Sequence, residues 1–454
     1  MSTSKKKIVI LGAGYAGIFL AINIARYVTE KAGEVILIDR NPYHQLLQEI
    51  HLVAAGFRTA DEVKIPILAL IDRMNIKFIQ SAVKQIMPDK NLVVLESTEI
   101  KYDLLIVCLG ASTKYFNIKG ARENTLPLRS ISDASLICDK VGALIKSNKK
   151  HNIVIVGGGA TGVSLGGALS DLVNESKKVD RLSITIIEAL PTILSGWDER
   201  LVKKVNEILH EKEIRIMTSS AVTRVENDDD GGSSIYLSDT GSKLHSSLTI
   251  WTAGVKGYDI PISPEVEKTK DGKIILNEFC QTDRYPNIFS IGDIAAVKDE
   301  YGKLYPPLAQ IAVREAKYLS KLIPKYVVSD LDDLSHLPPD EKFEYNMKVQ
   351  LISLGNDDYV GLFNTHVISG SLAKLVEEFS MSAYIKTLES GGRDIMNRSL
   401  YGDDIFSHLV SGITFARFTF MKWLEKRHNR LTKSHFLLQK ANCSPIIEAR
   451  IITL

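Results

Sequence analysis

The chain has 454 residues, which is too long for a single hydrophobic core and suggests about three domains. Hydrophobic residues make up 45% of it and charged residues 24%, the proportions of an ordinary globular protein rather than a disordered or fibrous one. The net charge of +2 excludes a strongly basic protein, so we expect no nucleic-acid partner.

The cysteines and the hydropathy pattern narrow the class of protein further. The four cysteines, Cys108, Cys138, Cys280 and Cys443, form no CxxC pair and no metal-ligand spacing. We therefore expect no metal site and a reducing, intracellular setting. Because the polar first residues lack an apolar leader, and no apolar run reaches about 18 residues, we expect neither a signal peptide nor a membrane span.

The first predicted strand, residues 8–11, runs into a glycine-rich turn. The turn contains Gly12, Gly14 and Gly17, and a second apolar strand ends in Asp39 about 20 residues later. In such a fingerprint the first glycine makes the turn, the second admits a pyrophosphate, and the third lets the helix pack on the strand. The acid accepts hydrogen bonds from a ribose diol, so this segment predicts a dinucleotide site.

The same arrangement occurs a second time, after an apolar strand at 101–109 and a linker and helix at about 116–151. A strand at 153–156 leads to Gly157, Gly159 and Gly162, and a strand at 184–187 ends in Glu188. Because a carboxylate there repels a 2′-phosphate, we expect this site to prefer NADH over NADPH. One such motif is a weak signal, but two in one chain predict two dinucleotide sites.

The elements that follow include one more strand that ends in a polar turn. Residues 227–234 read as a hairpin tip, and residues 248–254 as a strand that returns toward the first domain. A short strand at 286–291 then ends in Gly292 and Asp293, and small residues follow. Two paired strands are expected around residues 356–358.

The last segment differs in character from the rest of the chain. Residues 405–424 are apolar and aromatic, and residues 426–433 are basic. A helix of this kind suits a membrane interface, where anionic headgroups attract lysine and arginine. The alternative is a helix that packs on the body of the protein or on a second subunit.

With these motifs the chain resembles a known family, the type II NADH dehydrogenases. These are single-subunit NADH:quinone oxidoreductases that pump no protons, within the group of flavoproteins with two dinucleotide-binding domains. The resemblance covers nearly the whole chain. Besides the two turns, it is carried by residues 39–44, 49–56, 251–255, 286–296 and 307–312.

The resemblance implies an α/β fold with two Rossmann-like domains of the glutathione-reductase type and a C-terminal β/α region with amphipathic helices. The FAD-binding domain would comprise residues 1–115 and 252–326, and the NADH-binding domain residues 116–251. The C-terminal domain would span residues 343–454, with the membrane-associating helix at about 405–430.

The resemblance also implies the ligands, a tightly bound FAD and NADH. The Gly292–Asp293 turn would bind the ribityl chain of FAD. The cofactor-binding positions expected are Gly12, Gly14, Ala16, Gly17, Asp39, Arg40, Val83, Gly110, Gly157, Gly159, Thr161, Gly162, Glu188, Gly254, Gly292, Asp293, Ala309 and Gln310.

For catalysis, the resemblance points to the helix that begins with Ala309. Gln310 would line the quinone pocket, and Arg314, His44 and Glu49 are further candidates. The chain departs from the family pattern at Ser164, where a glutamate is usual, at Arg314, where a second glutamine is common, and at Gln48, where many members have proline. These changes affect the proton route and the quinone contacts, not cofactor binding.

The acceptor follows from what the chain lacks at residues 46–49. Glutathione-reductase-like relatives place a Cys-x4-Cys there, and this chain has Leu-Leu-Gln-Glu. We therefore expect electrons to pass directly to an acceptor, and a lipid-soluble quinone fits the predicted interfacial helix. The resemblance implies a peripheral enzyme at the cytoplasmic face of the cell membrane. Family members are often homodimers, so the resemblance implies a homodimer as well.

Three other functions stay open from the sequence. A sulfide:quinone oxidoreductase needs cysteines at the flavin, and none of the four cysteines has the expected position. A soluble NADH-dependent reductase of ferredoxin, rubredoxin or oxygen shares both fingerprints and is favoured slightly by Ser164. A flavin-bearing sensor would bind FAD without turnover.

Overall fold

The computed structural model describes residues 5–28, 33–229, 231–238, 241–328, 331–345, 349–363 and 366–392. These residues belong to one compact unit, except residues 375–387, which are part of a second. The segment predicted to associate with membranes, about 405–430, lies outside the described residues. In the described ranges, no helix has both the length and the apolar character needed to cross a bilayer.

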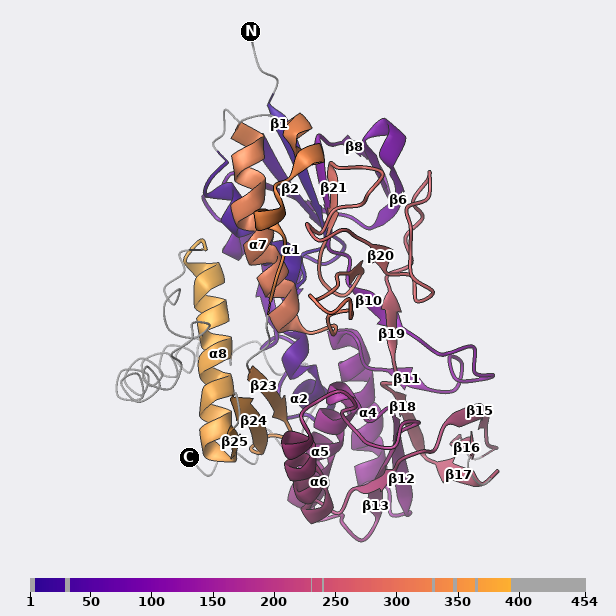
Figure 1. The fold of residues 1–454 in the computed structure, drawn as a ribbon. Coiled ribbons are helices and arrows are strands. Elements are labelled where there is room, and N and C mark those ends of the chain that lie inside the picture. The colour runs from indigo at the N-terminus through magenta and orange to yellow at the C-terminus, as the bar shows by residue number, and fades with distance from the viewer. Residues whose placement is uncertain are drawn as a thin grey trace. The chain divides into compact units, whose positions relative to one another are not determined.

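A five-stranded parallel sheet surrounds the first glycine turn, with the strand order β21-β9-β1-β2-β5 (Figure 1). Its strands are β1 Lys6–Leu11, β2 Gly33–Asp39, β5 Ile76–Gln80, β9 Leu104–Val107 and β21 Ile288–Ser290. Residues 8–11 of β1 are fully buried, as expected for a parallel strand that is covered on both faces. Because β21 pairs with β9, the chain returns to the first sheet late in the sequence.

A second five-stranded sheet surrounds the second glycine turn, with the order β11-β18-β12-β13-β14. Its strands are β11 Leu126–Pro127, β12 His151–Val156, β13 Leu182–Ile187, β14 Arg215–Met217 and β18 Leu248–Trp251. In both sheets the strand before the glycine turn has its sequence successor on one side and a later strand on the other. This is the switch point at which open α/β sheets bind ligands.

The helices are α1 Tyr15–Ala25, α2 Ile50–Ala54, α3 Ile67–Leu70, α4 Ile131–Lys146, α5 Ala160–Glu175, α6 Glu199–Glu211, α7 Ala309–Val328 and α8 Ser371–Glu389. α1 and α7 lie side by side (Figure 1). Side chains cap α4 and α6, where Ser130 and Asp198 accept backbone N–H bonds. The N-cap residues of α1 and α5 are instead Gly14 and Gly159, which have no side chain that could cap the helix.

Short strands form the remaining sheets. They are β3 Tyr43–Gln45, β4 Lys64–Pro66, β6 Val83–Met87, β7 Leu92–Leu95, β8 Glu99–Lys101, β10 Ala111–Thr113, β15 Val222–Asn227, β16 Ser233–Leu237, β17 Lys243–Ser246, β19 Val255–Gly257, β20 Ile274–Ile275, β22 Ala295–Ala296, β23 Val349–Ser353, β24 Tyr359–Phe363 and β25 His366–Ser369. β10 and β19, which follow β9 and β18 in the chain, pair antiparallel.

The predicted fold class is confirmed, because two parallel sheets with the same arrangement are present. The expected hairpin at 227–234 joins β15 to β16, and the expected strand pair around 356–358 is β23 and β24. The domain boundaries drawn from the sequence stay predictions.

Candidate functional site

The glycines of the first turn have three different environments. Gly12 has a φ of 97°, and a Cβ there would lie 2.4 Å from the carbonyl oxygen of Cys108 at the end of β9. A Cβ on Gly17 would lie 1.8 Å from the carbonyl oxygen of Gly12. Around Gly14, by contrast, no described atom lies within 4 Å of the Cβ position. The turn therefore leaves open space at the N-terminus of α1, where backbone N–H groups point out of the helix.

The second turn repeats this geometry. Gly157 has a φ of 114°, and a Cβ there would lie 2.6 Å from the backbone nitrogen of Ala253, just after β18. A Cβ on Gly162 would lie 1.9 Å from the carbonyl oxygen of Gly157. The Cβ position of Gly159 is again clear of described atoms to 4 Å. Both turns thus fit a pyrophosphate at a helix N-terminus.

Asp39, at the end of β2, is held against the first turn. Its Oδ2 accepts the N–H of Ala13 at 2.7 Å and its Oδ1 the N–H of Asn41 at 2.8 Å. Burial raises the pKa of this carboxyl. His44 lies on the other side of Ala13, with its Nδ1 2.9 Å from the carbonyl oxygen. Since burial lowers the pKa of His44 to about 4, the imidazole is neutral at pH 7 and holds the turn in place.

Glu188, at the end of β13, is held in the same way at the second turn. Its Oε2 accepts the N–H of Gly158 at 2.8 Å, and its Oε1 accepts the N–H of Leu190 at 2.9 Å. In both turns, one carboxylate oxygen accepts the N–H of the residue that follows the first glycine. The other oxygen accepts the N–H of the residue two positions after the acid itself. A carboxylate oxygen has more than one lone pair, so both acids keep acceptor capacity for a ribose diol.

The Gly292–Asp293 turn lies between α1 and α7. A Cβ on Gly292 would lie 3.5 Å from the Cβ of Ala16 and 3.8 Å from that of Ala312. Asp293 forms an ion pair with Arg129, whose Nη2 lies 3.2 Å from its Oδ2. No motif in the sequence indicates Arg129, because its partner is more than 160 residues away. This third polar turn distinguishes the first dinucleotide site from the second.

Other residues predicted to bind cofactors lie on the strands and helix starts around these turns. Gly110 and Gly254, with φ of 71° and 69°, follow β9 and β18. The guanidinium carbon of Arg40 lies 5.9 Å from the ring centre of Tyr258. Val83 begins β6. Thr161 lies in the first turn of α5, and Ala309 begins α7.

Two of the candidate catalytic residues, Gln310 and Arg314, contact the same side chain. It belongs to Tyr345, which no sequence motif indicates. The Nε2 of Gln310 donates to the hydroxyl of Tyr345 at 2.7 Å, and the guanidinium carbon of Arg314 lies 4.9 Å from the centre of the Tyr345 ring. Glu49 contacts a different partner, since its Oε2 lies 3.9 Å from the Nε of Arg58. Gln310 and Arg314 therefore share one aromatic neighbour, which helix spacing alone could not reveal.

Ser164, the departure in α5, makes a defined contact with β23. Its hydroxyl donates to the carbonyl oxygen of Ser353 at 2.6 Å. The Nε2 of His51 lies 3.0 Å from the hydroxyl oxygen of the same Ser353. Burial lowers the pKa of His51 to about 4. Ser164 stands where the resembled family usually has glutamate, and its neutral hydrogen bond links α5 to β23.

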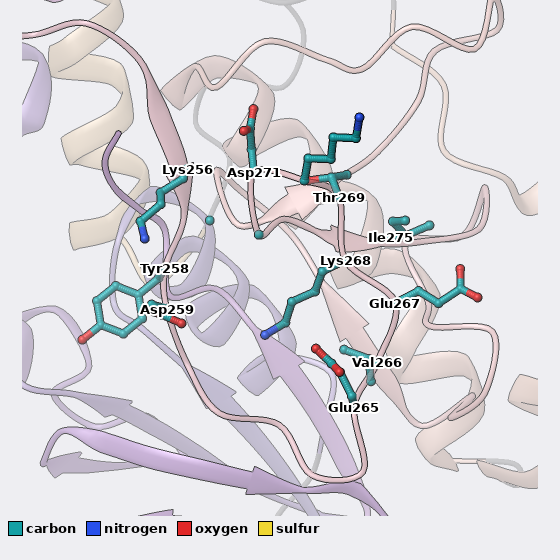
Figure 2. Close-up of a pocket in the computed structure, with 13 residues that line it drawn as sticks. Lys256, Tyr258, Asp259, Glu265, Val266, Glu267, Lys268, Thr269, Asp271 and Ile275 are labelled. Carbon is teal, nitrogen blue, oxygen red and sulfur yellow. The ribbon is translucent and has the colours of Figure 1, made fainter. Parts of the chain in front are cut away.

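A separate hollow of about 780 Å³ lies along β19 and the loop that follows it (Figure 2). Side chains of both charges line it, among them Lys256, Lys268, Asp259 and Glu265. None of the residues predicted to bind cofactors is among its lining residues. The two glycine turns therefore remain the best candidates for dinucleotide binding.

Comparison with known proteins gives the family. The family model described as pyridine nucleotide-disulphide oxidoreductase matches residues 6–316, which include both glycine turns and the Gly292–Asp293 turn. The chain belongs to this family. The match extends into α7 and includes Gln310 and Arg314.

Individual relatives agree with the resemblance seen in the sequence. The chain is 26% identical over 392 residues to the type II NADH:quinone oxidoreductase of Staphylococcus aureus strain MSSA476, covering 83% of this chain and 94% of that protein. Its fold is similar to that of NDH2 from Plasmodium falciparum in complex with NADH, with a TM-score of 0.72, 20% identity, and coverage of 85% and 95%. The predicted resemblance to type II NADH dehydrogenases is therefore confirmed, and the chain is an oxidoreductase of the pyridine nucleotide-disulphide family.

The same fold also occurs in an enzyme with a different donor. The sulfide:quinone oxidoreductase of Aquifex aeolicus matches with a TM-score of 0.72 at 19% identity, covering 90% of this chain and 95% of that one. Fold similarity at this level does not separate the two activities.

Proposed function

We propose that this protein oxidises NADH with bound FAD and passes the electrons to a membrane quinone, without pumping protons. The observation that supports it most directly is the pair of glycine turns with open helix N-termini, each with a strand-end carboxylate. Among the residues that the structure describes, the first turn and not the second lies beside a Gly-Asp turn, so we assign FAD to the first turn and NADH to the second.

The residues of the two sites bind and orient the reactants. Asp39 and Glu188 would accept hydrogen bonds from the two adenosine riboses, and the N-termini of α1 and α5 would bind the pyrophosphates. Asp293, which is paired with Arg129, would bind the ribityl chain. FAD, when bound, supplies the hydride and electron chemistry. The balanced reaction is NADH, a proton and quinone giving NAD⁺ and quinol, so one proton enters from solvent in each turnover.

The acceptor is a quinone and not a protein dithiol in this proposal. The described cysteines include Cys108 and Cys280, which are buried and free. Burial raises the pKa of both thiols well above the usual range, which suppresses the reactive thiolate. The same burial argues against Cys108 or Cys280 as a persulfide carrier in the oxidation of sulfide. Gln310 and Arg314, with Tyr345 between them, are proposed to contact the quinone.

We also propose that the enzyme is peripheral to the cytoplasmic face of the membrane and forms a homodimer. The apolar and aromatic sequence of residues 405–424 and the basic residues after it support membrane binding. The staphylococcal relative is named a quinone oxidoreductase, and a quinone is a lipid-soluble substrate.

A stopped-flow experiment on the purified full chain tests the proposal. NADH should bleach the absorbance of the bound flavin, and a ubiquinone or menaquinone analogue should then restore it faster than dissolved oxygen does. Restoration by ferredoxin, rubredoxin or oxygen, with no response to either quinone, would indicate a soluble reductase. Bleaching by sulfide and not by NADH would indicate a sulfide oxidoreductase, and a flavin that neither NADH nor sulfide bleaches would leave only a sensor.

A further inference from the structure

Glu315 is a buried carboxyl for which the proposed function has no use. It lies in α7 with only 2% of its surface exposed. Its Oε2 accepts the N–H of Gly292 at 2.6 Å, directly at the turn that carries Asp293. Buried glutamate is rare in proteins unless a partner compensates the loss of hydration, so its position at this turn needs a reason.

A small cavity of about 10 Å³ adjoins Glu315. The polar residues that line it are Glu315, Asp293, Lys273 and Tyr305, with the backbone of Gly292. A cavity of about this size holds one water molecule when polar partners surround it. The carboxyl thus has a place for a proton-carrying water between itself and more exposed groups.

The charges around Glu315 come from each element packed against it. Burial raises the pKa of its carboxyl to about 8, and the negative charge of Asp293 acts in the same direction. The hydrogen bond from the N–H of Gly292 and the charge of Lys273 lower the pKa of Glu315, and Arg129 pairs with Asp293. The other titratable groups that interact with it are Cys108, Cys280 and Tyr305.

We propose that Glu315 is a positioning residue that takes up a proton when the bound flavin is reduced and releases it on reoxidation. It acts through Gly292 and Asp293, which belong to the proposed FAD site. Reduction adds two electrons near this turn, and added negative charge favours the protonated form of a neighbouring carboxyl. The proton comes from solvent through the cavity, binds one carboxylate oxygen, and leaves by the same route. The inference rests on the FAD assignment of the proposed function but not on the identity of the acceptor.

The test is the midpoint potential of the bound flavin, measured with a reference dye and a chemical reductant between pH 6 and 10. In the wild-type chain we expect the potential to fall more steeply above about pH 8, by the equivalent of one more proton. One more proton changes the equilibrium constant for flavin reduction tenfold per pH unit. For a two-electron couple this is about 30 mV per pH unit. The Glu315→Gln variant keeps an acceptor for the N–H of Gly292 but cannot titrate, so the steeper segment should be absent. Glu267→Gln, which removes an exposed carboxyl, should keep it.

The same slope in wild type and in Glu315→Gln would overturn the inference. If the variant does not fold, proton uptake by the wild-type chain decides, measured with an indicator dye as the flavin is reduced at pH 8.5. Uptake no greater than that of free FAD would also overturn it. A chain that shows the steeper segment but is not reoxidised by quinone would refute the proposed function alone, and a chain that binds no FAD would refute both.

Discussion

At the scale of single residues, the glycines of each turn divide into those that the fold requires and one that the ligand requires. Gly12 and Gly17 are in backbone contacts that a Cβ would break. Gly14 and Gly159 have ordinary backbone angles and open space, so nothing in the described structure requires glycine there. We propose that glycine at these two positions leaves room for a phosphate.

Gly14→Ala should therefore fold normally and bind FAD at least tenfold more weakly, a loss of about 1.4 kcal/mol. The measurements are the thermal unfolding midpoint and the fluorescence of released FAD. Gly159→Ala is the matched control, which should keep FAD and weaken NADH. Gly17→Ala should instead destabilise the protein by about 3 kcal/mol through overpacking. Equal FAD affinity in Gly14→Ala and wild type would contradict the assignment of the first turn.

We propose that Glu188 decides the choice between NADH and NADPH. Glu188→Gln keeps an acceptor for the N–H of Gly158 or Leu190 but removes the negative charge. We expect NADH affinity to fall roughly tenfold, because hydrogen bonds to a charged acceptor are worth about 1.5–3 kcal/mol, and NADPH use to improve. Kinetics of flavin bleaching with each nucleotide measures both. An unchanged preference would show that the ribose is bound elsewhere.

His44 should make stability depend on pH. Its pKa in the folded protein is about 4, below the ordinary value of 6.5, so the unfolded chain binds the proton more readily. Its contribution, about 3 kcal/mol, is fully present above pH 6.5 and is lost as the pH falls toward 4. His44→Asn should unfold with a shallower pH dependence in urea titrations, whereas His210→Asn, which alters an exposed imidazole, should not. An unchanged slope in His44→Asn would mean that this imidazole is hydrated.

At the scale of elements, the start of α7 is organised by a segment from outside it. Gln310 donates to Tyr345, and Arg314, about one helical turn further on, stacks on the same ring. The geometry of the proposed acceptor site therefore depends on residues 343–345 as well as on the helix.

Gln310→Ala should lower kcat/KM for quinone about tenfold, and reduction of a soluble dye much less, because only the quinone would contact this side chain. Tyr345→Phe removes the acceptor of the Gln310 bond and keeps the ring, so it should shift quinone kinetics in the same direction by a smaller factor. Steady-state assays with both acceptors measure the split. Equal losses with quinone and dye in Gln310→Ala would place Gln310 at the flavin alone.

At the scale of the whole molecule, the proposed reaction needs two nucleotide-binding sheets. It also needs a segment that brings the protein to the membrane, where the lipid-soluble acceptor would be. Both glycine turns and the Gly292–Asp293 turn lie within residues 6–316. The proposed membrane contact lies in the segment 405–454, which is separate from them in the sequence.

Deletion of residues 405–454 should release the protein from anionic liposomes in a sedimentation assay while NADH–dye activity survives. Membrane-bound quinone reduction should fall with the loss of binding, because basic and apolar residues both contribute to interfacial affinity. Replacement of Lys426, Arg427 and Arg430 by glutamine is a milder control that should weaken binding to anionic vesicles specifically. A truncated chain that still sediments with liposomes would contradict this role.

The two sheets and their glycine turns could be predicted from sequence because the signals are local. Each unit has an apolar strand, a glycine with positive φ and, at the end of the next strand, an acid. Sequence alone therefore indicates Gly12, Gly157, Asp39 and Glu188. Their roles depend on backbone geometry that the residue types themselves dictate.

The partners of the polar side chains were decided only by the tertiary structure. Arg129 reaches Asp293, Glu315 lies under Gly292, and Tyr345 receives Gln310, each across a sequence distance that no motif spans. Burial and long-range charge pairing arise only when the sheets and helices pack, and these two effects set the ionisation of Glu315 and the neighbours of the proposed flavin site. The sequence determined which ligands the protein is built to bind, and packing decided which side chains surround them.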